Sequence, residues 1–177
     1  MLSSAIADLA VLGIARHGGA PVDRVSKIAK SIVPDLWTPT VDVIDEVILR
    51  NRNVGFLVII GSAEFTRLQL TETGTQRFWS LITQKLEPHN NRGRCALEAL
   101  QFFFLDGADP ATVTAVLERQ HSRVREQLRE LKKRCQCCPQ KGRYSGLWMD
   151  MERQRLEATA EMLVSASLDH SGQQPDA

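Results

Sequence analysis

The residues with the most reactive side chains are three crowded cysteines, Cys135, Cys137 and Cys138. Cations surround them, and a neighbouring positive charge favours the thiolate that is oxidised or binds soft metals. A structural zinc site normally combines two C-x2-C pairs, whereas this cluster reads C-x-C-C. Cys135 also fits an apolar helix seam, where a thiol packs as a small hydrophobe. A redox or metal switch and incidental cysteines at a helix end are both compatible with this pattern, and we expect no bound metal.

Catalytic motifs are missing from the sequence. It contains no G-x-S-x-G, no glycine-rich phosphate loop and no H-E-x-x-H, the patterns of serine hydrolases, nucleotide-binding proteins and zinc proteases. We therefore expect a protein that is not an enzyme and that needs no cofactor.

The composition is that of a globular protein rather than a fibrous or disordered one. Of 177 residues, 43% are hydrophobic and 24% charged, with 22 Lys and Arg against 21 Asp and Glu. Only residues 84–141 are clearly basic, so the strong positive excess of many nucleic-acid binders is missing. No run of 18 apolar residues marks a membrane span. The start of the chain makes a poor signal peptide, and with the crowded cysteines this predicts a cytoplasmic protein that does not enter the membrane.

Three helices and a hairpin are predicted in the first part of the chain. Apolar residues at helical spacing mark helices over residues 2–16 and 21–33. Thr38 followed by Pro39 predicts the start of a third helix, with Val41, Ile44 and Ile48 facing the core. Two strand-like runs, 56–60 and 65–70, flank a short glycine-containing turn, and a further helix follows Thr71. This order is typical of a winged helix-turn-helix.

The remainder of the chain is predicted to be helical. A helix covers residues 95–104, a long helix starts at Pro110, and a last helix covers 147–168. The long helix has apolar residues at coiled-coil spacing. We expect that a single copy cannot fully cover this seam, and we therefore predict a homodimer. The predicted dimer interface is Leu117, His121, Val124, Leu128, Leu131, Leu156 and Leu163.

Two short motifs resemble a known family. The run Leu9-Ala10-Val11-Leu12-Gly13 is similar to an opening "LAILGLL" pattern, and Leu68-Gln69-Leu70-Thr71-Glu72-Thr73-Gly74 is similar to "YxLTxxG". Both patterns are those of the PadR family of bacterial transcriptional regulators, which this chain resembles over nearly its whole length. The resemblance implies a mainly α fold with a small β-hairpin. It places a winged helix-turn-helix domain in residues 1–86, a helical dimerisation domain in 87–168 and a disordered tail in 169–177.

The resemblance also implies a homodimeric regulator that binds double-stranded DNA. The candidate DNA-binding residues are Lys27, Lys30, Thr38, Thr40, Arg50, Arg52 and Arg67. The third helix departs from the family, since Asp42, Asp45 and Glu46 would repel DNA phosphates. The wing tip has an acid, Glu64, where a cation is usual. The alternative is therefore a non-catalytic protein-interaction module, in which the acidic third helix binds a protein partner.

Regulators of this family hold small planar ligands between helices of the dimer. Aromatic and sulfur-containing side chains suggest an apolar ligand pocket here, with Phe102, Trp148 and Met151 as its candidate lining. Ordinary core and dimer packing would explain the same residues.

Overall fold

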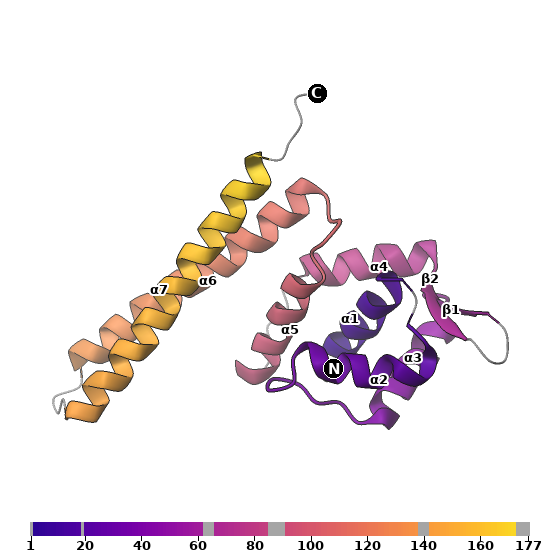
Figure 1. The fold of residues 1–177 in the computed structure, drawn as a ribbon, viewed down its shortest axis with the longest axis horizontal. Coiled ribbons are helices and arrows are strands. Elements are labelled where there is room, and N and C mark those ends of the chain that lie inside the picture. The colour runs from indigo at the N-terminus through magenta and orange to yellow at the C-terminus, as the bar shows by residue number, and fades with distance from the viewer. Residues whose placement is uncertain (1, 19, 62–65, 85–90, 138–141, 173–177) are drawn as a thin grey trace. The chain divides into compact units, whose positions relative to one another are not determined.

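The computed structural model describes residues 2–18, 20–61, 66–84, 91–137 and 142–172, and Figure 1 shows their ribbon. The chain divides into two compact units. We call Met1–Gly107 the head and Ala108–Ala177 the arm. The fold is mainly α-helical with one small β-hairpin, as the sequence predicted.

The head contains five α-helices, one 3-10 turn and two strands among its described residues. In chain order these are α1 (Leu2–Arg16), η1 (Val22–Arg24), α2 (Val25–Ile32), α3 (Val41–Asn53), β1 (Leu57–Ile60), β2 (Arg67–Leu70), α4 (Glu72–Thr83) and α5 (Asn91–Phe103). The helix α1 is the centre of this unit, and α2, α3, α4, α5 and β2 all contact it. Its sequence is apolar on nearly every side, which is the composition expected of a helix that is buried all round.

The wing is an antiparallel hairpin in which Leu57 pairs with Leu70 and Ile60 with Arg67. Leu57 and Leu68 are buried, so one face of the hairpin belongs to the core. Pro21 forms an isolated bridge with Arg67, which adds a one-residue strand beside β2. The amide of Leu68 donates to the carbonyl of Ala20 at 3.2 Å and strengthens this attachment. The sequence pattern did not predict this third strand, because one residue has no periodicity.

A buried glycine brings α4 close to the wing. Thr71 caps α4 by accepting a hydrogen bond from the amide of Gly74 at 3.0 Å. A Cβ atom at Gly74 would lie 1.9 Å from the carbonyl oxygen of Phe56. The Leu-Thr-x-x-Gly element is therefore a helix cap followed by a position where any side chain would force the neighbouring backbone to move.

The helix α5 belongs to the head, although the predicted domain boundary followed residue 86. Its residues Ala96, Leu97 and Leu100 are buried, and Phe104 just beyond it is 1% exposed. A Cβ atom at Gly13 of α1 would lie 2.5 Å from the ring of Phe104. This close approach packs the end of α5 into the centre of the head, so the two units divide after Gly107.

The arm is a pair of long helices, α6 (Pro110–Cys137) and α7 (Arg143–Gly172), which lie side by side. Asp109 caps α6 by accepting from the amide of Thr112 at 2.9 Å. The last helix starts before the predicted residue 147 and runs beyond 168. None of the helices in the described part of the chain combines the length and the hydropathy needed to cross a bilayer.

The apolar seam of α6 is covered by α7 of the same chain. Its residues Leu117, Val124 and Leu131 form one buried cluster with Leu156 and Leu163 of α7. We expected a single copy to leave this seam uncovered, and this expectation was wrong. The last helix, α7, folds back along α6 and covers the seam. Five of the seven residues predicted for the dimer interface are therefore buried within one chain, while His121 and Leu128 are half-buried.

Two further predictions about α3 need correction. Thr40, rather than Thr38, caps the helix, and its hydroxyl oxygen accepts from the amide of Val43 at 3.4 Å. Val41 was expected in the core but is 53% exposed. Ile44, Val47 and Ile48 supply the buried face instead. Val41 shares the helical phase of this face, but it is the first residue of the helix and lies about one turn before the first buried position.

Candidate nucleic-acid interface

The outer face of α3 is acidic and partly apolar. Asp42, Asp45 and Glu46 are all exposed there, as the sequence suggested. Leu49 lies among them and is 55% exposed. The first-turn position of Asp42 suits the positive end of the helix dipole. We call these four residues the acidic face; its charge opposes the approach of a phosphate backbone.

Four candidate DNA contacts are exposed cations of the head. Lys27 and Lys30 lie on α2, Arg52 lies at the end of α3 and Arg67 starts β2. In the described part of the chain, none of these four has an ion pair within 4 Å. The Pro21 bridge holds Arg67 beside the segment that leads into α2. The cations are therefore available, on three elements of one compact unit, for contacts with phosphates.

Arg50, another candidate, is paired with an acid of the head. One of its terminal nitrogens lies 2.6 Å from Oδ1 of Asp8 on α1. The same oxygen accepts a second hydrogen bond, from the side-chain amide of Asn51 at 2.7 Å. Asn51 is 3% exposed and also donates to the carbonyl of Val47 at 2.8 Å. Arg50 thus joins α3 to α1, and we leave it out of the contact set.

The two candidate threonines are both exposed, but they differ in their local role. Thr40 caps α3, while Thr38 lies two residues before it. The wing-tip acid Glu64 lies outside the described residues. Gly61, the residue after β1, has a φ of 109°, a left-handed conformation that suits glycine.

The wing adds exposed apolar surface rather than charge. Val58, Ile59 and Ile60 of β1 are each at least 37% exposed. These β-branched side chains suit a strand, but they cannot pair with phosphates. This half of the hairpin is therefore better suited to contact an apolar surface.

The cysteine cluster lies at the end of α6. Cys135 has a free, half-buried thiol, whereas the side chain of Cys137 and all of Cys138 lie outside the described residues. Among the side chains that the structure does describe, no three His, Cys, Asp or Glu residues are grouped as metal ligands would be. The redox and metal roles of this cluster stay predictions.

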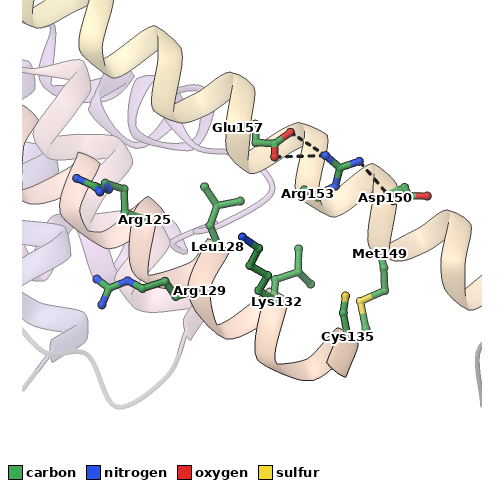
Figure 2. Close-up of a pocket in the computed structure, with 10 residues that line it drawn as sticks. Arg125, Leu128, Arg129, Lys132, Cys135, Met149, Asp150, Arg153 and Glu157 are labelled. Atoms are coloured by element: carbon green, nitrogen blue, oxygen red, sulfur yellow. Dashed lines mark hydrogen bonds and ion pairs between the residues drawn. The ribbon is translucent and has the colours of Figure 1, made fainter. Parts of the chain in front are cut away.

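The three residues suggested for a ligand pocket lie in different units. Phe102 is in the head and is 41% exposed, while Trp148 and Met151 are in the arm and are 55% and 61% exposed. The arm does contain a groove between α6 and α7, but other residues line it (Figure 2). A second, apolar hollow lies in the head beside His17 and Phe104. Sequence spacing along single helices could not indicate either hollow, because each is formed by more than one helix.

Two comparisons with known proteins found no match: no family model fits the sequence, and no curated protein is similar to it. The search of solved structures found PadR proteins, members of the family that the sequence resembles. Bacillus subtilis PadR in complex with p-coumaric acid aligns over 95% of this chain and 97% of its own, with 15% identity and a TM-score of 0.43. A PadR-like transcriptional regulator from Bacillus cereus aligns over 95% and 99%, with 12% identity and a TM-score of 0.42. Bacillus subtilis PadR in complex with operator DNA aligns over 91% and 96%, with 16% identity and a TM-score of 0.40.

Proposed function

We propose that this chain is a non-catalytic winged-helix transcriptional regulator that acts in the cytoplasm and binds duplex DNA mainly through its phosphate backbone. One observation carries the proposal: the head combines α1, α2 and α3 with a paired wing, and four exposed cations, without an ion pair among the described side chains, lie on α2, the end of α3 and β2. Phosphate contacts fix the position of a protein on a duplex, whereas base contacts read its sequence.

The acidic face shapes how the head would bind. Three carboxylates on α3 weaken any deep insertion into a groove lined by phosphates. A carboxylate can accept a hydrogen bond from N4 of cytosine, so one of the acids is compatible with base reading. We expect Lys27, Lys30, Arg52 and Arg67 to supply the affinity, and the acidic face of α3 to supply little of it.

Salt titration tests this division of roles. Each phosphate contact contributes about 0.9 to the slope of log K against log salt. Replacing Lys27 and Arg52 by Ala removes two contacts per head, so the slope should fall by about 2 for each head bound. The affinity should fall equally for all duplex sequences, as measured by fluorescence anisotropy.

A matched control is available in the arm. Lys133→Ala with Arg134→Ala removes the same charge from two exposed residues, and it should change the slope by much less. An effect of the head variants that is confined to one duplex sequence would contradict the assignment as phosphate contacts.

We further propose that two copies associate through an exposed seam of α7. The residues Tyr144, Trp148, Met151, Arg155, Ala158 and Met162 follow each other at alternating spacings of four and three, the spacing of a coiled-coil seam. Tyr144 is 79% exposed and Met162 is 56% exposed, so α6 leaves this second seam uncovered. Large exposed apolar strips of this kind favour association.

Sedimentation measures this association directly. We expect the native chain to have the mass of a dimer at micromolar concentration, and Met151→Glu with Met162→Glu to have the mass of one subunit. Leu168→Glu is the control, because Leu168 is an equally exposed residue of α7 that lies outside the second seam. A single-subunit mass for the native chain, or equal dissociation by the control, would contradict the proposal.

The second candidate function is docking of a protein partner on the acidic face. Exposed Leu49 among three carboxylates, together with the exposed apolar residues of β1, suits a partner that presents cations around an apolar residue. The same titration separates the candidates. Measurable binding of non-specific duplex that weakens with salt supports the DNA regulator, and no binding at low salt supports the protein-interaction module.

A further inference from the structure

A groove on the arm combines an apolar floor with a cationic rim. It lies between α6 and α7 and has a volume of about 330 Å³ (Figure 2). Its floor comes from Leu128 and Leu131 of α6 and Met149 of α7. Leu131 is 7% exposed and belongs to the core of the arm, while Leu128 and Met149 are half-buried and pack against that core. A partner that fills the groove must therefore supply an apolar side chain.

The rim of the groove has a surplus of positive charge. Four cations and two acids line it: Arg125, Arg129, Lys132, Arg153, Asp150 and Glu157. Arg153 donates to both acids, to Glu157 at 3.3 Å and to Asp150 at 3.5 Å (Figure 2). Arg129 pairs at 2.7 Å with Glu126 of its own helix. Arg125 and Lys132 have no ion pair within 4 Å among the described side chains, so they are available to a partner.

The acidic face of α3 has the complementary composition. Its residues Asp42, Asp45, Glu46 and Leu49 follow each other at helical spacing, so they lie within an arc of about 100° around the helix. All four are exposed. The three carboxylates have no ion pair within 4 Å among the side chains that the structure describes. This face therefore offers what the groove requires, an apolar side chain among unpaired acids.

The two surfaces also agree in shape and length. The acidic face extends over seven positions of α3, from Asp42 to Leu49, which is about 10 Å along the helix. Arg125 and Lys132 are likewise seven positions apart on α6, with Leu128 between them on the same side of the helix. An amphipathic helix docks by laying one such stripe of side chains into a groove between helices. Two of its turns would match the distance between the two cations.

We propose that this groove is a docking site for the acidic face of α3 from a second copy of the chain. Leu49 of one copy would cover Leu128 and Met149 of the other, and the acids beside it would pair with Arg125 and Lys132. Charge complementarity selects this occupant, because opposite charges around an apolar contact favour one partner and one orientation. Each copy carries both surfaces, so no further component is needed.

This inference rests on the second candidate function, the docking of a protein on the acidic face, and it names the partner. Docking would cover the outer side of α3, so a docked head could not present that helix to DNA. The second seam stays free, because Met151 of that seam and Arg153 of the groove are two positions apart, about 200° around α7. The two proposed contacts between copies therefore use different sides of the arm.

An exchange of charge between the two surfaces tests this contact in the full-length protein. The head variant carries Asp45→Lys with Glu46→Lys, and the arm variant carries Arg125→Glu with Lys132→Glu. All four residues are exposed, so neither variant should disturb folding. Within either variant the two surfaces repel each other, and association through the groove should weaken at least tenfold relative to the native chain. Mixing the two variants brings opposite charges together again, which can restore only a contact between two molecules.

Met149 reports whether the groove is occupied. The chain has four methionines, and among those of α7 only Met149 lines the groove. When the arm variant carries carbon-13 methionine methyl groups, addition of the unlabelled head variant should shift its Met149 signal in a saturable way. Met151 and Met162 should shift much less. Raising the salt to about 0.5 M should reduce the shift several-fold, because salt screens exposed charges.

A matched control reverses the same charge outside the groove. Lys133→Glu with Arg134→Glu changes two exposed residues in the same stretch of α6 that do not line the groove. This control keeps Arg125 and Lys132, so the head variant should leave its Met149 signal unchanged.

Three outcomes would overturn the proposal. One is no shift of Met149 when the two variants are mixed at millimolar concentration, which would assign the groove to a different occupant. Another is an equal shift in the control, which would show attraction to the basic end of α6 as a whole. The third is a Met149 signal that depends equally on concentration in the native chain and in both variants, which would show that a second copy docks through another surface. None of these outcomes affects the duplex titration, which tests the proposed function by itself.

Discussion

Replacing Asp8 by Ala tests the polar junction between α1 and α3. The change removes two hydrogen bonds that reach one carboxylate oxygen, from Arg50 at 2.6 Å and from Asn51 at 2.7 Å. Their costs should differ, because the side chain of Arg50 is 39% exposed and can be rehydrated, whereas Asn51 is 3% exposed and cannot. The exposed charge pair contributes about 0.5 kcal/mol. An orphaned buried N–H costs about 1–3 kcal/mol, so Asp8→Ala should lower the free energy of unfolding by about 2 kcal/mol.

Urea unfolding followed by tryptophan fluorescence measures this loss. Replacing Trp148 by Phe restricts the signal to the head, which contains Trp37 and Trp79. Asp8→Asn is the matched control, since it keeps an oxygen that can accept from Asn51 and should lose less stability than Asp8→Ala. In double-mutant cycles, Asp8 should couple more strongly to Asn51 than to Arg50. Additive effects of Asp8→Ala and Asn51→Ala would refute the reasoning.

Two other predictions concern the packing of the head. Gly74→Ala places a methyl group against the carbonyl oxygen of Phe56, and should lower the free energy of unfolding by about 1–3 kcal/mol in the same urea assay; unchanged stability would show that no close approach exists. Arg16 lies 4.6 Å from the ring centroid of Trp79 and donates to the carbonyls of Asp106 and Gly107. Arg16→Ala should therefore alter Trp79 fluorescence and speed amide hydrogen exchange around residue 106, and protection equal to that of the native chain would argue against this attachment.

Local patterns in the sequence correctly identified the helices and strands that form through interactions between residues close together in the chain. The helix that follows Thr71, the paired runs on either side of Gly61 and the buried faces of the helices all depend on interactions within a few residues. The outward position of the acids was also predictable, because helical periodicity places Asp42 and Glu46 about 200° around the helix from Ile44, and Asp45 about 100° from it.

Periodicity was less reliable at the ends of elements. It predicted Thr38 as the cap of α3 and Val41 as a core residue, whereas the helix starts two residues later than that cap would require. A threonine followed by a proline favours a helix start, but Thr40 offers a second cap of the same chemistry. The choice between two such caps depends on where the helix packs, which the local sequence does not specify.

The assignment of side chains to partners was decided by the tertiary structure. The sequence shows that α6 has an apolar seam, but an apolar seam specifies only that something covers it. The fold supplies α7 of the same chain and leaves Trp148 and Met151 exposed instead. Arg50 is likewise a plausible phosphate contact in the sequence and an internal partner of Asp8 in the fold. Hydrophobic contact is not directional, and the pair of Asp8 and Arg50 joins residues that are distant in sequence. Only the folded chain therefore determines which cations and which apolar faces remain available for a ligand, DNA or a second copy.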